Sequence, residues 1–315
     1  QAAGDGLPAT VAKLLTFTND AAVEQEALAI YGTTVPPSAQ IGGRLNKEWW
    51  IYLLLRNPNP FQERLARCLL DRFATSERVF HDNFRWVMHF QIQLFRRFSV
   101  DAGDRVAVKP VPVGASPSLA AIAQQIDTAG IAYNWRNLLV QIAKDRAMLE
   151  WLNGRGSVKD APNENFAREL WELFMLGEGN GYTETDIQEA ARAFTGFYMY
   201  FPRASEPQPT QLGYASFLHD ETSKTILGRT GLFGYDSISP FWSLTYDPYT
   251  HDPAVETDPR DTGGGVIALT LAQRPVEASR HICRKLFEFL VYENPHDSIV
   301  NALAAQLRAP GRNQW

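Results

Sequence analysis

The clearest pattern of hydrophobic and polar positions along this chain lies in residues 162–197. A stripe of apolar side chains recurs there with helical spacing: Phe166, Leu170, Leu173 and Phe174. Counted from Phe166, the others follow at steps of four, seven and eight. These steps stack all four on one side of a helix with about 3.6 residues per turn. We therefore predict a helix over residues 164–176 whose apolar side faces the core.

Polar residues at the ends and on the opposite side complete this predicted helix. Glu164, Arg168 and Glu172 repeat every four residues, so Arg168 is expected to pair with a carboxylate one turn above and one turn below. Asn163 is expected to cap the start of the helix, since its side-chain oxygen can accept a backbone N–H. Gly177 is expected to end it, because glycine adopts the left-handed backbone at little cost.

A second helix is predicted directly after the first. Thr183 and Asp186 resemble a capping box with a shorter acid. The next apolar stripe consists of Ile187, Ala190, Ala191 and Phe194. The segment therefore predicts a helix over 164–176, a tight glycine-rich link and a helix over 185–195, packed at the centre of the fold.

Helical patterns continue through most of the chain and are interrupted by proline-rich segments. Further helices are expected at 47–55, 61–73, 77–98, 118–125, 135–151, 266–274, 275–292 and 298–307, with one or two short helices within 11–31. No Gly/Ser linker or charge block divides the 315 residues. We predict a mainly α fold with a single compact multi-helix domain over 1–315. Residues 198–264 form its long aromatic-rich and Pro-rich irregular insertion, which is either packed over the helices or functional.

Several motifs resemble those of one bacterial family. NENFARELWELFMLG from Asn163 and YTETDIQEAARAFTGF from Tyr182 carry the closest likeness. Flanking motifs in the expected order are WWIYLLLRNPNPFQERLA from Trp49, LDRFATS from Leu70, AKDRAMLEWLNG from Ala143, HDETSKTILG from His219 and RHICRKLFEFLVYENP from Arg280. The chain is similar over most of its length to the bacterial domain of unknown function 1800 family. The resemblance implies an exported, largely helical protein and implies no reaction.

The same resemblance bears on metal binding. Family members tend to read WHxHF where this chain has residues 69–73, so Leu70 and Arg72 stand in place of two histidines. Leucine offers no lone pair and arginine is a permanent cation, so neither replaces a histidine ligand. We expect no metal and no cofactor. Elemental analysis should find no stoichiometric transition metal, and a chelator should leave stability unchanged.

Arg72 has an unusual place in its predicted helix. It lies seven positions after Leu65, inside an apolar stripe that includes Cys68 and Leu69. One interpretation is a buried ion pair with Glu169, Glu172 or Asp220, because an unpaired buried charge is costly. The other is that the helix ends before Arg72, so that its side chain reaches water.

Other polar residues also have two interpretations. Glu169, Glu172 and Asp220 are the catalytic candidates, since paired carboxylates about 5 to 9 Å apart divide acid and base roles in glycoside hydrolysis. The alternative, which we favour, is a structural polar network that these acids form with Arg72, Glu164, Arg168 and His219. Adjacent His219 and Asp220 suit a metal or a proton shuttle, yet a His-Asp pair in a loop more commonly closes a turn.

Composition limits the classes of partner. The net charge of −5 supplies no basic stripe for a phosphate backbone, so nucleic-acid binding is disfavoured. The longest apolar run, residues 49–55, is far shorter than a bilayer span, so we expect no transmembrane segment. Aromatic residues make up 12% of the chain, more than a helical core needs, and some are expected on a surface that docks proteins.

The cysteines and the first residue bear on localisation. Cys68 and Cys283 lie on apolar faces of predicted helices and are interpreted as small buried hydrophobes, with a disulfide between them as the alternative. Gln1 in place of methionine fits a mature terminus after signal cleavage. The expected location is periplasmic or extracellular.

Two functional classes follow. The first is an exported, non-catalytic interaction or scaffold protein, an accessory subunit of a larger extracytoplasmic or membrane-associated assembly. It needs a protein partner and is compatible with peripheral association with a membrane complex. The second is a hydrolase-like enzyme acting on an extracellular polymer through paired carboxylates. Convergence of the three candidate acids beside exposed rings would favour the enzyme.

Overall fold

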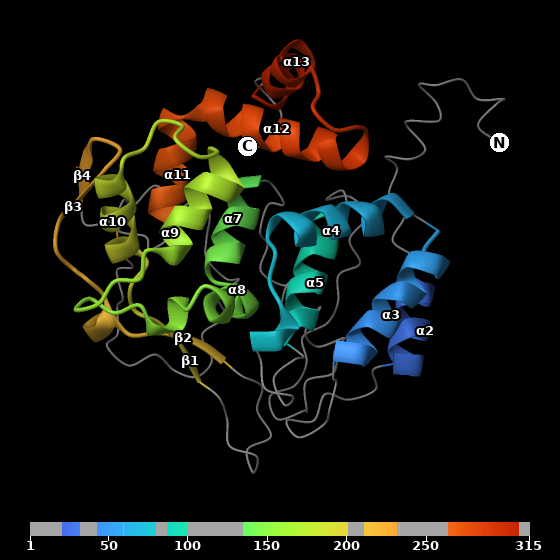
Figure 1. Ribbon diagram of the computed structural model, residues 1–315. Helices are drawn as coiled ribbons and strands as arrows, with labels where there is room; N and C mark the ends of the chain where they lie inside the picture. Colours follow the sequence, from blue (N-terminus) through green and yellow to red (C-terminus); the bar gives the residue numbers. More distant parts are fainter. Residues whose placement is uncertain are drawn as a thin grey trace. The chain divides into compact units, whose positions relative to one another are not determined.

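The computed structural model confirms a mainly helical chain (Figure 1). It describes residues 21–31, 43–58, 60–79, 87–99, 135–200, 211–231, 233 and 264–308. The helices are α2 (Ala21–Tyr31), α3 (Gly43–Arg56), α4 (Pro60–Arg72), α5 (Val87–Phe98), α7 (Trp135–Ala143), α8 (Arg146–Trp151), α9 (Asn165–Glu169), α10 (Glu184–Ala193), α11 (Gly264–Gln273), α12 (Pro275–Leu290) and α13 (Asp297–Leu307). Short 3-10 turns lie at Glu77–Val79, Gly154–Gly156 and Ser216–Leu218, and a π-helix, η5, spans Leu170–Met175.

The chain divides into two compact units. The first holds α2 to α5. The second holds Arg72–Thr75 and the described elements from α7 onward. The expectation of one domain over 1–315 therefore stays a prediction. The predicted helix at 118–125 and much of the predicted insertion at 198–264 lie outside the described residues.

The described part of residues 198–264 contains short strands that the sequence pattern did not predict. β1 (Phe197–Tyr200) pairs antiparallel with β2 (Gln211–Tyr214), and β3 (Lys224–Ile226) pairs antiparallel with β4 (Arg229–Gly231). Leu227 and Gly228 join β3 to β4 with positive φ values of 48° and 74°, as a two-residue hairpin turn requires. Strands of three or four residues carry too little alternation to be recognised from sequence.

In the first unit, described residues of α2, α3 and α5 share one core cluster that contains aromatic side chains. α2 and α3 lie side by side, and their shared core consists of Ala27, Trp49, Leu53 and Ile92, the last from α5. The Trp49 ring lies 4.4 Å from the imidazole of His89, centroid to centroid. The core of this unit therefore joins α2, α3 and α5 through one cluster.

In the second unit α9 contacts α10 and η5, and α12 contacts η5 and α11 (Figure 1). A buried tryptophan, Trp171 of η5, lies among them. The Trp171 side chain is 0% exposed, and its Nε1 donates to Thr270 Oγ1 of α11 at 3.0 Å. Its ring stacks on Tyr182 with centroids 5.5 Å apart. Trp171 thus ties η5 both to α11 and to the glycine-rich link that leads into α10.

The predicted helix 164–176 begins as an α-helix and continues as a π-helix from Leu170 to Met175. Leu176 donates its backbone N–H to Trp171 O at 2.8 Å, five residues back. The wider turn changes which side chains face the core. Leu173 is therefore 54% exposed, so its predicted burial is wrong.

Both ends of this helical segment follow the prediction. Asn163 Oδ1 accepts the Asn165 N–H at 2.9 Å, and Gly177 ends the segment with φ of 86°. The capping box also forms, with Thr183 Oγ1 accepting from Asp186 N and Asp186 Oδ2 accepting from Thr183 N. The predicted single helix at 135–151 is instead two, α7 and α8, because Asp145 caps a new start by accepting the Met148 N–H.

Candidate functional site

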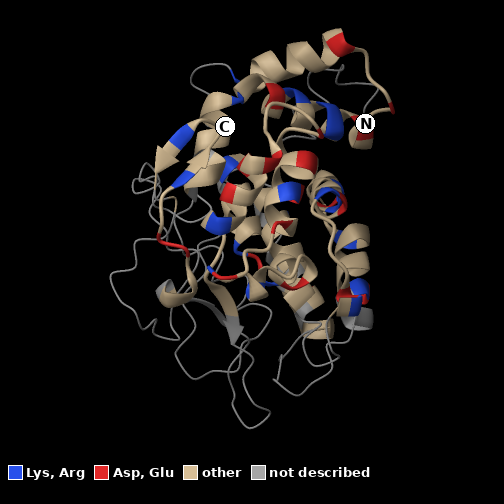
Figure 2. Cartoon of the chain, turned by 60° about the vertical axis from the view of Figure 1, so that its left-hand side comes forward, with Lys and Arg blue, Asp and Glu red and all other residues tan. Residues whose placement is uncertain are grey.

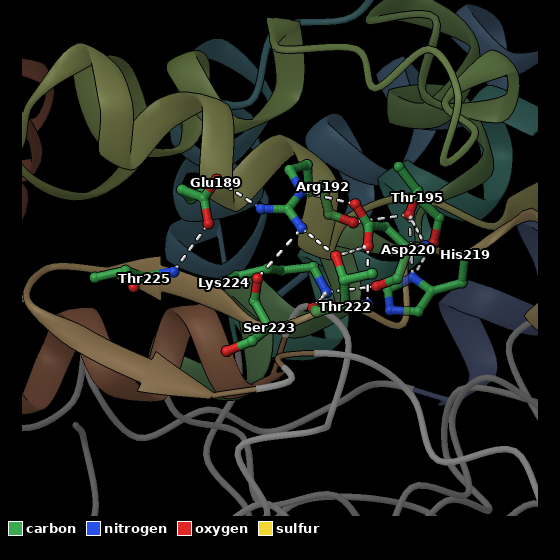
Figure 3. A network of polar contacts seen from close by, with 9 residues as sticks. All are labelled: Glu189, Arg192, Thr195, His219, Asp220, Thr222, Ser223, Lys224 and Thr225. Atoms are coloured by element: carbon green, nitrogen blue, oxygen red, sulfur yellow. Dashed lines mark hydrogen bonds and ion pairs between the residues drawn. The ribbon is translucent and has the colours of Figure 1, made fainter.

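Arg192 is the centre of the polar network drawn in Figure 3. Its Nε donates to Asp220 Oδ2 at 2.6 Å, and its Nη1 donates to Glu189 Oε1 at 2.6 Å. Its Nη2 donates to Thr222 Oγ1 and to the Ser223 carbonyl. One guanidinium on α10 therefore fixes the loop that leads into β3. No sequence pattern indicated a role for Arg192.

His219 ties the same loop to the end of α10. Its Nδ1 lies 2.8 Å from the Thr195 carbonyl oxygen, which only accepts, so Nδ1 carries the proton. Thr195 Oγ1 accepts the Asp220 N–H at 2.9 Å, and Asp220 Oδ1 accepts the Thr222 N–H at 2.9 Å. Burial lowers the pKa of His219 to about 4. His219 therefore donates as a neutral ring to a backbone carbonyl, and the adjacent Asp220 closes a turn. This geometry agrees with the interpretation of the His-Asp pair as part of a turn.

Asp220 is held as a carboxylate. Burial acts to raise its pKa, but hydrogen bonds from Arg192 and from both the side chain and the backbone of Thr222 bring the pKa below its usual value. A carboxylate so tightly bonded by donors is a poor general acid near neutral pH.

Lys224, the first residue of β3, is buried beneath this loop, with 1% of its surface exposed. Its Nζ donates to the backbone carbonyls of Asp220 and Thr222 (Figure 3). Burial lowers the pKa of the ammonium from 10.5 to about 8, because loss of water disfavours the charged form. The buried ammonium therefore opposes folding whenever it is protonated.

The depressed pKa of Lys224 predicts a rise in stability with pH. Between pH 8 and 10.5 the folded state releases its proton while the unfolded state still holds it, so the free energy of unfolding rises through this window. The rise is at most about 3 kcal/mol at about 1.36 kcal/mol per pKa unit. Urea unfolding as a function of pH measures it. Lys224→Met should remove the slope, whereas the exposed Lys159→Met should keep it. An unchanged slope in Lys224→Met would contradict the assignment.

Arg168 binds the acids predicted for it and one more. Its Nη2 lies 3.2 Å from Glu164 Oε2, and its Nη1 lies 3.4 Å from Glu172 Oε1. Glu184 of α10 also pairs with Arg168. The first two contacts follow from helical spacing, whereas the third joins α10 to α9 across the glycine-rich link and was not predicted.

The three acids considered as catalytic candidates do not share one arginine as their partner. Glu172 belongs to the Arg168 network, and Asp220 belongs to the Arg192 network. Glu169 is half-buried, and burial followed by the charge of Glu172 raises its pKa. The structure therefore divides these acids between two ion-pair networks and leaves Glu169 beside the first.

The predicted ion pair of Arg72 is not formed with any residue that the structure describes. Of the expected partners, Asp220 pairs with Arg192 and Glu172 pairs with Arg168. α4 extends through Arg72, so the expectation that the helix ends before Arg72 is wrong. The Arg72 side chain is half-buried. It lies at a groove of about 550 Å³. The groove is lined by Arg72, Glu172, Leu173, Leu176, Gly177, Glu178, Asn180, Val276, Glu277, Arg280, His281, Arg284 and Lys285.

A small effect on stability follows for Arg72. Arg72→Ala should change the free energy of unfolding by less than about 1 kcal/mol, because no buried carboxylate is stranded by its loss. Thermal or urea unfolding of the variant against the unmodified chain measures the change. A loss of about 3 kcal/mol or more would show that a buried pair exists after all.

Sequence reasoning missed a buried polar network in the first unit. Glu63 of α4 and Arg96 of α5 are 0% and 1% exposed, with Arg96 Nη2 2.8 Å from Glu63 Oε1 and Nε within 3.1 Å of both carboxylate oxygens. Trp50 Nε1 and Asn57 Nδ2 each donate to Glu63 at 2.9 Å. Glu63 stands three positions before the buried Ala66, so its helical position carried a signal that it faces inward.

In the described part of the chain, no three His, Cys, Asp or Glu side chains gather where they could hold a metal ion. Cys68 and Cys283 are both buried and are not joined by a disulfide, as the first interpretation of the cysteines expected. Basic and acidic residues are interspersed along the described helices in Figure 2. No described helix is both long and apolar enough to cross a bilayer.

Comparison with known proteins gives one finding. The profile of the family described as Protein of unknown function (DUF1800) matches residues 1–313. Comparison with curated proteins and with solved structures gives no match.

Proposed function

Since the chain belongs to the DUF1800 family, which has no established reaction, we propose from its own geometry that it is a non-catalytic interaction or scaffold protein. It acts outside the cytoplasm as an accessory subunit of a larger extracytoplasmic or membrane-associated assembly. One observation carries the proposal: Glu172 and Asp220 are bound by different arginines, Arg168 and Arg192. Acids held in ion-pair networks stabilise a fold and are poorly placed to exchange protons with a substrate.

The surface of the second unit supports binding as the activity. Exposed large apolar side chains include Leu173 on η5, Val276 on α12, Val291 and Tyr292 at the end of α12, and Leu303 on α13. Single exposed apolar residues are ordinary, but Leu173 and Val276 both line the groove beside Arg72. Apolar side chains next to an arginine are typical of surfaces that bind other proteins.

The hydrolase alternative rests on one observation. The raised pKa of Glu169 is what a general acid needs. A partner carboxylate with a complementary role is also needed, and Glu172 on the same helix is already bound by Arg168. We therefore propose that the protein acts by binding a partner and not by hydrolysis.

Isolation of a native complex tests the proposal. The protein, tagged and expressed in its native host, is extracted from the extracytoplasmic fraction and sized by chromatography with light scattering. We expect a complex with a second protein in fixed stoichiometry. A monomer in the extract, together with release of reducing ends from cell-wall or extracellular polysaccharide by the purified chain, would overturn the proposal in favour of the hydrolase.

A further inference from the structure

The geometry points to the groove between α12 and the end of η5 as a binding site for a peptide in which a carboxylate stands next to an apolar side chain, with Arg72 as the group that binds the carboxylate. This inference rests on the proposed function, since it names the site and the chemistry of the partner.

The groove has two walls of different origin. One wall is a face of α12, whose lining residues recur at helical spacing: Val276, Glu277, Arg280, His281, Arg284 and Lys285. The other wall is the end of η5 and the start of the glycine-rich link, from Glu172 to Asn180. A volume of about 550 Å³ suits a short peptide segment rather than a folded domain.

The basic side chains of the groove differ in whether they already form an ion pair with an acid. Arg280 and Arg284 both pair with Asp297, and Lys285 lies 3.7 Å from Glu288. Arg72 has no acid partner among the residues that the structure describes. Its guanidinium therefore keeps its hydrogen-bonding groups for a ligand, and a guanidinium binds a carboxylate through two parallel bonds.

The acids of the groove restrict the ligand to low charge. Glu172 is bound by Arg168, whereas Glu178 and Glu277 stand along the walls and form no ion pair with a described residue. Two nearby carboxylates repel a ligand of high charge density such as a phosphate. Among anionic ligands, one with a single carboxylate that reaches Arg72 is repelled least by these two acids.

His281 adds an acceptor to the α12 wall. Its Nε2 donates to the Leu173 carbonyl at 2.8 Å, so Nδ1 keeps a lone pair. Nδ1 lies beside Gly177, where an added Cβ would come within 3.0 Å of it. Burial lowers the pKa of His281, and the charges of Lys285 and Arg72 act in the same direction. A neutral His281 accepts an N–H from a peptide backbone without competing for its carboxylate.

The apolar part of the ligand is indicated by Leu173 and Val276. These exposed side chains lie on opposite walls, 54% and 47% exposed. The π-helix is the reason that Leu173 is at the groove and not in the core. A ligand side chain placed between them removes apolar surface of both residues from water, which favours binding.

Peptide binding measured by calorimetry tests the inference. The probe is an acetylated and amidated six-residue peptide of Gly and Ser with a central Leu-Asp pair, and its control carries Leu-Asn. A third peptide ends in a Leu with a free carboxylate, which distinguishes a C-terminal from a side-chain source. We expect the Leu-Asp or the free-ended peptide to bind at least tenfold more tightly than Leu-Asn. Arg72→Gln should remove that difference.

A matched variant controls for charge and for folding. Arg229 is exposed on β4 of the same unit and lies outside the groove, so Arg229→Gln should bind as the unmodified chain does. Both variants should unfold at the same temperature as the unmodified chain. Equal affinity for Leu-Asp and Leu-Asn, no binding by any of the three peptides, or equally tight binding of inorganic phosphate would each overturn the inference. A native complex that survives Arg72→Gln would overturn it too while leaving the proposed function intact.

Discussion

Removal of either partner of the Glu63–Arg96 pair is expected to lower the free energy of unfolding of the first unit by about 3 to 5 kcal/mol. Both side chains are buried, and Glu63 accepts from Arg96, Trp50 and Asn57. Glu63→Ala strands a cation beneath Trp49, whose ring lies 5.5 Å from the Arg96 guanidinium carbon. Arg96→Ala strands a carboxylate in the same place. Urea unfolding followed by tryptophan fluorescence measures both losses.

A double substitution and a surface pair serve as controls. Glu63→Gln with Arg96→Met should recover part of the loss, because neither change leaves a lone buried charge. Lys47→Ala, which breaks the 2.6 Å pair with Glu77, should change the free energy by less than about 1 kcal/mol because Lys47 is mostly exposed. Single variants of Glu63 and Arg96 that unfold within 1 kcal/mol of the unmodified chain would show that the pair contributes no more than a surface contact.

Trp171→Ala is expected to destabilise the second unit by about 3 to 5 kcal/mol, the range for an aromatic side chain removed from a core. The loss combines the cavity with the broken hydrogen bond to Thr270 and the lost stacking on Tyr182. Leu173→Ala should change the free energy by less than about 1 kcal/mol, since Leu173 is 54% exposed.

Trp171→Ala and Leu173→Ala together distinguish a π-helix from a regular α-helix in this segment. A regular helix through residues 166–174 predicts the reverse order, with the larger loss at Leu173. Thermal unfolding of both variants, each with near-ultraviolet circular dichroism as a check on folding, gives the order. A loss at Leu173→Ala that exceeds the loss at Trp171→Ala would rule out the π-helix.

The features that could be predicted from sequence are those formed by residues close together along the chain. The capping box of Thr183 and Asp186, the left-handed Gly177 and the pairing of Arg168 with acids one turn away each depend on residues within a few positions, so spacing alone predicts them. The π-helix is a local irregularity, and within it Trp171 packs against α11, a contact between distant residues that spacing does not encode.

What could not be predicted were the polar pairs between distant residues. Glu63 and Arg96 are 33 positions apart, and Arg192 and Asp220 are 28 apart. No periodicity joins such residues, so spacing could not predict these pairs. Asp220 was one of three acids considered as a partner of Arg72, whereas in the structure it pairs with Arg192.

The central claim is that the protein works through the groove at Arg72 and not through its acids. The most direct measurement recovers the tagged protein from its native host in three forms, unmodified, Glu169→Gln and Arg72→Gln, and compares the bound partner by mass spectrometry. The account predicts equal amounts of partner with the unmodified chain and Glu169→Gln, and loss of the partner with Arg72→Gln. Retention of the partner by Arg72→Gln, or polymer hydrolysis that disappears only in Glu169→Gln, would contradict it.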